Sequence, residues 1–220
     1  MEWLKGIFES FKDLRTDVII VLAVLVLAAA IVLVMAGKKK KQNWTTQQLS
    51  VGALCIASAF VLSYIRVWHM PQGGSITLAS MLPIMVFAYL YGLPKGLIVG
   101  LAYGALQMFQ DLFAVHWLQV TLDYGVAFMA LALAGVFRKK VSRGSLLAGM
   151  TLAGLTRFAA HTVSGAVFFG EYAPVGQNVW LYSMGYNSFV FIDLAICIVI
   201  AMLPPVYDFI KRQRALVGGK

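Results

Sequence analysis

Charged and hydrogen-bonding side chains interrupt two otherwise apolar stretches of the chain. Asp123 lies in "LQVTLDYGVAF", with Gln119 one helical turn before it and Tyr124 directly after it. Arg157 and His161 lie one turn apart in "TRFAAHTVSG", so a helix there would present both side chains on one face. A carboxylate in such a stretch would meet a cation or hydrogen-bond donors. An ionisable residue inside a membrane helix is a functional candidate by default.

Two alternatives to a ligand site remain open for these residues. Asp123 and Arg157 would form a purely structural ion pair if their helices packed together, and a lone histidine often only links two helices. His161, however, shares its face with Arg157. Gly165 continues that face and permits close approach, and Phe169 would supply an aromatic wall. We therefore interpret this face as part of a binding site.

A third polar group opens a later apolar stretch, "LYSMGYNSF". Tyr182 and Asn187 are five residues apart, which is about 140° around an ideal helix. Both would face one site only if the start of that helix is irregular, and Gly185 permits this.

The composition indicates an integral membrane protein. Of the 220 residues, 60% are hydrophobic and only 12% are charged, and the mean hydropathy is +0.81. A soluble domain is usually about a quarter charged. Lipid cannot hydrogen-bond the backbone, so long apolar runs that do not alternate with polar residues must be helices. The fold class predicted is all-α.

The apolar runs predict two parts of the chain. Residues 1–45 comprise an amphipathic segment (1–17), an extra transmembrane helix (18–37) and a Lys-rich loop (38–41). Residues 46–220 form one six-helix domain. Its predicted spans are about 47–67, 75–91, 95–114, 118–137, 145–169 and 181–205.

The net charge of +9 does not indicate nucleic-acid binding, because the basic residues cluster between the apolar runs. Their distribution instead predicts the orientation of the bundle in the membrane. Most of the basic residues fall on alternate connections, which the positive-inside rule places in the cytoplasm, with the N-terminus outside. If residues 18–37 are not a true span, the N-terminus lies inside and the other six spans are unchanged. The opposite connections are "RVWHMPQGG", "DLFAVHW" and "GEYAPVGQNVW". They and the adjoining helix ends hold the three histidines and many aromatic residues. An interfacial aromatic belt accounts for part of this cluster but not for Asp123, Arg157, His161 or Asn187, which a ligand site would explain.

Motifs for catalysis and energy coupling are absent from the sequence. There is no GxxxxGK[ST] phosphate loop, no HExxH and no metal-spaced His/Cys cluster. Cys55 and Cys197 lie in apolar spans and are interpreted as small core residues. An intramembrane enzyme that uses Asp123 and His161 as acid and base is therefore disfavoured. We predict no enzyme, no cofactor and no metal site.

Several separate stretches resemble one family. "GGSITLASMLPIMVFAYLYGLPKGLIVGLAYGALQ", "HWLQVTLDYGVAF", "RFAAHTVSGAVFF" and "YSMGYNS" are similar to the thiamine-specific substrate-binding S component of energy-coupling factor (ECF) vitamin transporters. The resemblance covers roughly residues 47–205. It implies a six-helix S-component bundle in the bacterial plasma membrane that captures thiamine at the extracellular side. A shared coupling protein and two ATPases would energise transport. An S component for another flat vitamin or precursor, such as a pyrimidine or pyridoxal compound, is the alternative.

The resemblance also implies roles for single residues. The family's ligand-binding positions fall on Asp123, Tyr124, Arg157, His161, Gly165, Tyr182 and Asn187, and its gating tryptophan falls on Trp68. Some members have Glu at the position of Asp123, and a tryptophan can stand where this chain has Phe169. Phenylalanine still stacks but is a weaker cation partner.

Two alanines on the first core helix carry a partner prediction. Ala53 and Ala57 form a small-residue pattern that alone indicates helix packing. The family's AxxxA surface falls on them, which implies docking to the coupling protein. The repeat Gly92, Gly96, Gly100, Gly104 is interpreted as packing within the bundle.

Overall fold

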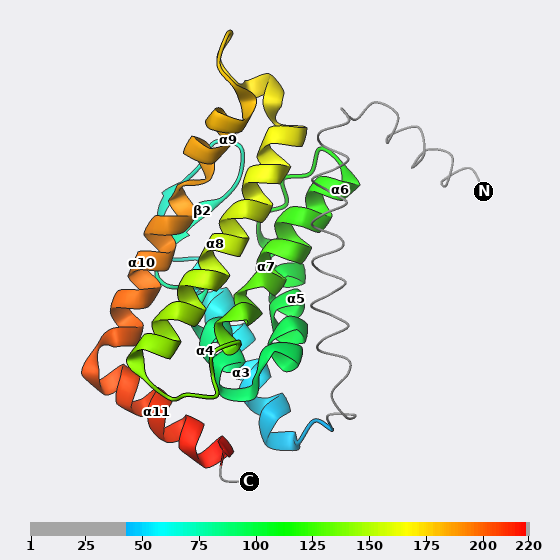
Figure 1. Ribbon diagram of the computed structural model, residues 1–220. Helices are drawn as coiled ribbons and strands as arrows, with labels where there is room; N and C mark the ends of the chain where they lie inside the picture. Colours follow the sequence, from blue (N-terminus) through cyan, green and yellow to red (C-terminus); the bar gives the residue numbers. More distant parts are fainter. Residues whose placement is uncertain (1–42, 219–220) are drawn as a thin grey trace, which may run out of the picture.

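The computed structural model describes residues 43–218, which form a bundle of helices with one short hairpin (Figure 1). The predicted all-α membrane class is confirmed in its main lines. The elements in chain order are α3 (Thr46–Ser63), β1 (Arg66–His69), β2 (Ser75–Thr77), α4 (Leu82–Tyr91), α5 (Leu93–Gln110), α6 (Trp117–Val120), the π-helical η1 (Thr121–Val126), α7 (Ala127–Met129), the 3-10 helix η2 (Ala130–Gly135), α8 (Arg143–Phe168), the 3-10 turn η3 (Gly170–Tyr172), α9 (Val179–Asn187), α10 (Phe189–Met202) and α11 (Pro204–Gly218).

The predicted amphipathic segment, the extra transmembrane helix and the Lys-rich loop lie outside the described residues. The division of the chain at residue 45 therefore stays a prediction.

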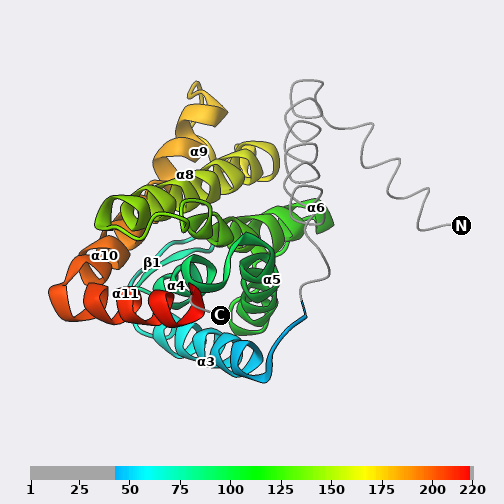
Figure 2. The same cartoon turned by 60° about the horizontal axis from the view of Figure 1, so that its bottom comes forward.

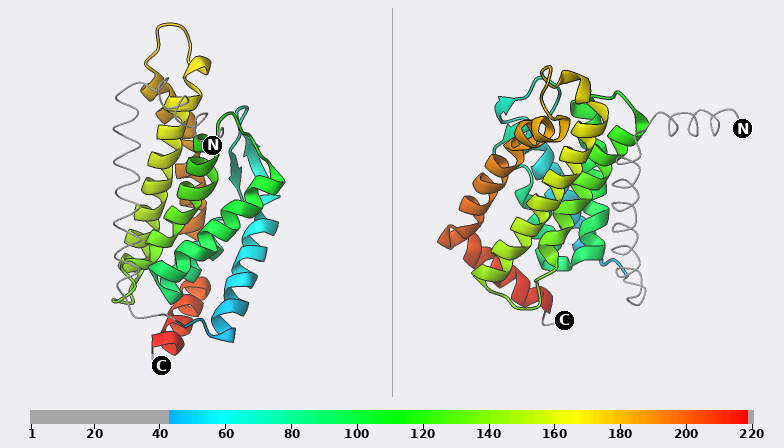
Figure 3. Two further views of the ribbon diagram at one scale, coloured as in Figure 1. Left: turned by 90° about the vertical axis from the view of Figure 1, so that its right-hand side faces the viewer. Right: turned by 45° about the horizontal axis from the view of Figure 1, so that its top comes forward.

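The predicted second span is wrong at its start. Residues 75–77 are not helical but form β2, which pairs antiparallel with β1, and the helix begins only at Leu82. The first span likewise ends at Ser63 and gives way to β1. The hairpin turns at Gly73 and Gly74, whose φ angles of 84° and 88° favour glycine. It lies toward the end of the bundle where α6 and α9 begin (Figure 3).

Local sequence explains where the long helices start and stop. Thr45 caps α3 in a capping box with Gln48, and Ser142 caps α8 in the same way with Ser145. Gly92, at φ 96°, separates α4 from α5, and the Leu-Pro pair that follows starts α5.

The core surrounds α4, which is only 10 residues long and buried around most of its circumference. It contacts α3, α5, η2, α8 and α11. Its fully buried side chains include Ile84, Met85, Phe87 and Tyr89. A helix that is apolar on all sides must be enclosed by other helices. Smaller apolar clusters around Leu122 and Val163 and around Ile76, Phe189 and Val190 lie outside this core.

The glycine repeat on α5 packs within the bundle, as predicted. A Cβ on Gly100 would lie 2.6 Å from the carbonyl oxygen of Phe128, and one on Gly104 would meet the carbonyl oxygen of Tyr124. The glycines therefore let α5 approach the η1–α7 segment closely, which fixes the position of Tyr124.

Three helices of the described part are long and apolar enough to cross a membrane. They are Thr46–Ser63, Trp117–Gly135 and Val179–Met202. Lys95, Arg143 and the helix α11 lie at one end of the bundle, and α11 runs across that end (Figures 1 and 2). This is the end that the basic residues assign to the cytoplasm.

Candidate ligand-binding site

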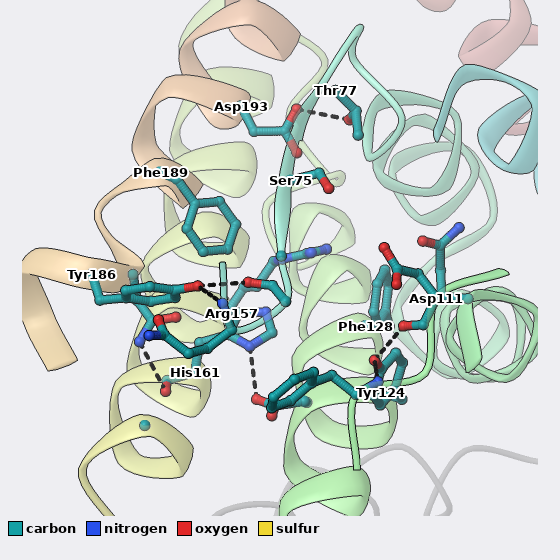
Figure 4. Close-up of a pocket in the computed structure, with 18 of the residues that line it drawn as sticks. Ser75, Thr77, Asp111, Tyr124, Phe128, Arg157, His161, Tyr186, Phe189 and Asp193 are labelled. Carbon is teal, nitrogen blue, oxygen red and sulfur yellow. Dashed lines mark hydrogen bonds and ion pairs between the residues drawn. The ribbon is translucent and has the colours of Figure 1, made fainter. Parts of the chain in front are cut away.

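A cavity opens between the hairpin and the helices α5, α8, α9 and α10, and the core side chains Tyr103 and Phe128 form part of its wall. Its lining includes eight of the nine predicted ligand-binding residues. These are Asp123, Tyr124, Arg157, His161, Gly165, Phe169, Tyr182 and Asn187. Figure 4 shows the centre of this cavity, with Arg157 between the α10 side and the Tyr124 side.

Asp123 is the most heavily hydrogen-bonded carboxylate of the site. Its Oδ2 accepts hydrogen bonds from Gln119 Nε2 at 2.7 Å and from Ser164 Oγ at 2.9 Å. Its Oδ1 lies 2.8 Å from Nδ1 of His161. Asp123 lies in the π-helical η1, and such wide turns are frequent at functional sites because they re-aim side chains. Three donors hold the charge of Asp123 in a fixed position.

His161 bridges Asp123 and the far side of the cavity. Because the carboxylate can only accept, the proton of this contact lies on Nδ1. The other ring nitrogen, Nε2, is buried and has no partner in the part of the chain that the structure describes. The imidazole faces the ring of Phe189, with the ring centres 6.3 Å apart. A ligand group would satisfy the free nitrogen.

Tyr124 supports the loop at the mouth of the cavity. Its hydroxyl donates to the backbone oxygen of Asp111 at 2.6 Å and accepts from the backbone N–H of Phe113 at 3.0 Å. Both hydrogen bonds go to the segment after α5. The hydroxyl is therefore occupied, and Tyr124 offers a ligand mainly its ring.

Arg157 is buried in the cavity wall without an ion pair among the described residues. Its guanidinium lies over the ring of Phe128, 4.3 Å from the ring centre. Its Nε and Nη1 have no hydrogen-bond partner in the same part of the chain. The structural ion pair between Arg157 and Asp123, the alternative raised by the sequence, is not formed, because His161 takes that place.

Gly165 and Asn187 join α8 to α9. A Cβ on Gly165 would collide with Ser183 and lie 3.0 Å from Asn187 Nδ2, so the element that approaches Gly165 is α9. Asn187 donates to the backbone oxygens of His161 and Ser183. Asn187 and Tyr182 both line the cavity although α9 is helical through both. The irregularity expected near Gly185 instead falls at residue 188, between α9 and α10.

Aromatic rings surround the outer part of the cavity. Phe169 contacts Phe113 and Tyr172, with ring centres 5.7 and 6.2 Å apart. Trp68 is not in the lining, since it lies on β1 with 63% of its surface exposed. A contact between Trp68 and a ligand stays a prediction.

The hairpin is held over the cavity from two sides. The Tyr186 hydroxyl accepts from the backbone N–H of Gln72 at 2.7 Å and donates to the backbone oxygen of Gly73 at 3.1 Å. On the other side, Arg66 forms an ion pair with Asp111 at 2.9 Å. These contacts tie the hairpin to α9 and to the end of α5.

The other two histidines have structural roles. His69 Nδ1 lies 3.0 Å from Ser75 Oγ, across the hairpin. His116 caps α6 by accepting from the backbone N–H of Leu118, and its ring stacks on Phe168. Burial lowers the pKa of His116, which favours the neutral ring that this cap requires.

Asp193 is the functional candidate that sequence reasoning missed. It lines the cavity from α10, is 3% exposed, and accepts a hydrogen bond from Thr77 at 3.1 Å (Figure 4). It stands alone in the apolar stretch "FVFIDLAICIVIAM". The rule that selects Asp123, a carboxylate inside an apolar span, selects Asp193 equally.

The charges that line the cavity leave an excess of one negative charge when His161 is neutral. The cations are Arg66 and Arg157, and the anions are Asp111, Asp123 and Asp193. Such a site favours a ligand with one positive charge.

Comparison with known proteins decides the family. A model of the family described as thiamine transporter protein (Thia_YuaJ) matches residues 49–211. The chain belongs to this thiamine transporter family. A relative named thiamine transporter ThiT from Bacillus subtilis is 36% identical over 172 residues, which is 69% of this chain and 89% of the relative.

Two further matches to this thiamine transporter family agree. A thiamine transporter ThiT from Lacticaseibacillus paracasei is 31% identical over 152 residues, which is 62% of this chain and 75% of the relative. The solved structure of ThiT from Listeria monocytogenes superposes with a TM-score of 0.66 at 26% identity and covers 74% of this chain and 96% of that one. The family is a transport family and not an enzyme family. The predictions of a multi-pass bacterial membrane protein and of the S-component family are confirmed.

Proposed function

We propose that this member of the thiamine transporter family is the thiamine-binding S component of an ECF-type ABC importer and captures thiamine from the extracellular side. The observation that carries the proposal is the excess negative charge of an aromatic-walled cavity. Thiamine combines one permanent positive charge on its thiazolium ring with a flat, hydrogen-bonding aminopyrimidine. A cation is stabilised by a carboxylate and by ring faces, and a flat ring is held by stacking.

The side chains divide the work in this proposal. Asp123, held by three donors, supplies the counter-charge for the thiazolium. Phe169 and Tyr182 supply ring faces. The free Nε2 of His161 and the free N–H groups of Arg157 supply hydrogen bonds to the ligand. Trp68 would reach the ligand only if the hairpin moved.

A titration of the purified protein in detergent with thiamine tests this function. Binding heat is the primary readout, because neither Trp180, which packs beside α8, nor Trp68 on the hairpin lines the cavity; quenching of the tryptophan fluorescence would report a change around either ring. The absence of both quenching and binding heat at micromolar thiamine would exclude the proposal.

A neutral flat vitamin is the second candidate for the same family fold. A pyridoxal compound or a simple pyrimidine would leave one carboxylate of the cavity without a counter-charge, and a buried uncompensated charge is costly. Competition against bound thiamine separates the two candidates. We expect unlabelled pyridoxal to displace thiamine only at concentrations far above those of unlabelled thiamine itself.

A coupling protein and two ATPases would supply the energy, since the chain has no phosphate loop of its own. Ala53 and Ala57 lie exposed, one turn apart on α3, where a partner helix can approach closely. Replacing both with Leu is expected to prevent assembly with the coupling protein and leave thiamine binding intact. Ala102 and Ala105, exposed on α5, provide the control, since their replacement with Leu adds the same bulk to another face. Equal assembly of the two double variants would exclude docking at Ala53 and Ala57.

A further inference from the structure

A group of five basic side chains gathers at the cytoplasmic end of the bundle, far from the cavity. This basic cluster consists of Arg138, Lys139, Lys140, Arg143 and Arg214. The first three follow η2, Arg143 begins α8, and Arg214 lies on α11. None of them forms a salt bridge with a carboxylate within residues 43–218. The carboxylate of Asp208 on α11 is exposed and also unpaired within that range.

Two arginines of the basic cluster are half-buried and held close together. Arg214 Nη2 donates to the backbone oxygen of Arg138 at 3.5 Å, and Arg138 Nη1 donates to the backbone oxygen of Leu90 at 3.2 Å. Burial, and then the charge of Arg214, lower the pKa of Arg138. Like charges that repel each other at such a site are stabilised by an anion between or above them.

The arginines retain hydrogen-bond donors for such an anion. A guanidinium carries five N–H groups, and Arg138 and Arg214 each use one in these contacts. The Nε of Arg214 is buried and has no partner among the described residues. Arg143 lies over the ring of Tyr207, 4.9 Å from its centre, and thereby joins α8 to α11. The cluster is thus a built surface with three elements fixed around it.

Exposed apolar side chains border the basic cluster. On the η2–α8 side they are Val136, Phe137, Val141 and Leu147, and on α11 they are Phe209 and Leu216. Basic groups next to exposed apolar side chains are typical of a helix at a membrane surface, where the apolar groups enter the acyl region and the cations meet headgroups. The arrangement of α11 across the end of the bundle, seen in Figure 2, fits that position.

The positive-inside rule, which sets the orientation of the protein in the membrane, does not require arginines that are fixed and half-buried. Basic residues that only obey the positive-inside rule need to be present in a loop, exposed and free. Lys139 and Lys140 meet that description, since both are exposed. Arg138 and Arg214, by contrast, are half-buried and fixed by backbone contacts.

We propose that the basic cluster is a binding site for the phosphate headgroup of an anionic phospholipid of the inner leaflet. The cytoplasmic leaflet carries the anionic lipids that attract such clusters. Planar guanidinium groups bind phosphate oxygens through paired hydrogen bonds. The lipid would neutralise the cluster and fix α11 against the bundle.

Lipid titration of the whole protein in detergent tests the proposal. Phosphatidylglycerol is expected to raise the thermal unfolding temperature and to appear as a bound lipid in native mass spectra, whereas phosphatidylcholine does neither. In Arg138→Gln/Arg214→Gln the affinity for phosphatidylglycerol should fall roughly tenfold or more, since each nearby cation contributes about 1 kcal/mol. Lys211→Gln/Arg212→Gln removes the same charge from exposed positions of α11 and should lower the affinity clearly less than the Arg138/Arg214 change, because exposed charges are screened by salt.

Three results would overturn the site. If the two double Gln variants lost the same affinity for phosphatidylglycerol, the lipid would be attracted by the net charge of the protein and not by a specific site. Equal stabilisation by inorganic phosphate would assign the cluster to a free anion. Equal effects of the two lipids would show that the cluster does not select an anionic headgroup. Arg138→Lys/Arg214→Lys keeps the charge but loses the planar guanidinium groups, so it should retain only part of the lipid binding. Circular dichroism checks the helix content of each variant, so that a loss of binding in the Gln variant is not assigned to misfolding.

Discussion

Nδ1 of His161 lies 2.8 Å from Oδ1 of Asp123, and this contact joins α8 to η1 at the centre of the cavity. The contact fixes the orientation of both side chains, because Gln119 and Ser164 donate hydrogen bonds to the other carboxylate oxygen of Asp123. The cavity therefore presents a pre-positioned negative charge and a free imidazole nitrogen. Pre-positioned groups lose little freedom on binding, which favours high affinity.

Asp123→Asn should weaken thiamine binding by about 1–3 kcal/mol, or roughly 5- to 150-fold, because it removes the counter-charge and a charged acceptor. Calorimetric titration measures this change. Asp208→Asn, which removes a carboxylate from the exposed surface of α11, provides the control and should leave the affinity unchanged. Equal affinity of the Asp123 variant and the wild type would place the ligand away from Asp123.

Ser164→Ala should have a smaller effect of the same sign. It removes one of the three donors that position Asp123 but leaves the carboxylate in place, so we expect only part of that hydrogen-bond energy to be lost in binding, about 0.5–1.5 kcal/mol or roughly a 2- to 12-fold fall in the affinity for thiamine. Ser188→Ala serves as the control, because that hydroxyl is exposed and bonds only the backbone of its own helix. If Ser164→Ala lost more affinity than Asp123→Asn, the carboxylate would not be the main counter-charge of the ligand.

Arg66→Gln should mainly accelerate ligand release. The ion pair with Asp111 joins the hairpin to the end of α5 across the mouth of the cavity, and it is partly exposed. Such pairs contribute up to about 1 kcal/mol, so we expect the dissociation rate to rise by at most roughly fivefold, with a weaker effect at high salt. Stopped-flow fluorescence measures the rate. Arg66→Lys retains the charge and should stay near the wild type, and an unchanged rate in Arg66→Gln would show that the pair does not restrain the hairpin.

Gly104→Ala should destabilise the bundle by about 1–3 kcal/mol, the usual cost of added bulk in a packed interface. The new methyl group would meet the backbone of Tyr124, so α5 and η1 must separate. The fall in thermal unfolding temperature in detergent reports this loss. Gly185→Ala is the matched control, since a Cβ there contacts nothing within 4 Å. Similar melting temperatures for the two variants would argue against the tight packing of α5.

Composition and hydropathy predicted the membrane class and most helices, because in lipid the backbone has few other options. The hairpin was missed for a physical reason. Its strands are short, and contacts that are distant in sequence stabilise it, such as those of Tyr186 with the turn. The "GG" turn between "RVWH" and "SIT" is a local signal for it, but the apolar run from Ile76 onward favoured a continuous helix.

The sequence predicted which residues line the candidate site better than it predicted what each of them contacts. The carried-over residues gather around one cavity, except Trp68, whose strand holds it outward. Sequence spacing could not show that Tyr124 braces a loop or that α9 fills the space beside Gly165, because both depend on the tertiary neighbour.

The proposed function depends above all on the preference of the cavity for a ligand with one positive charge. Parallel calorimetric titrations with thiamine and with its neutral aminopyrimidine half measure that preference. We expect thiamine to bind at micromolar concentration or below, and the neutral half to bind at least roughly tenfold more weakly, since a charged interaction contributes about 1.5–3 kcal/mol. Equal affinities for the two compounds, or no binding of thiamine, would contradict a site selective for this charge.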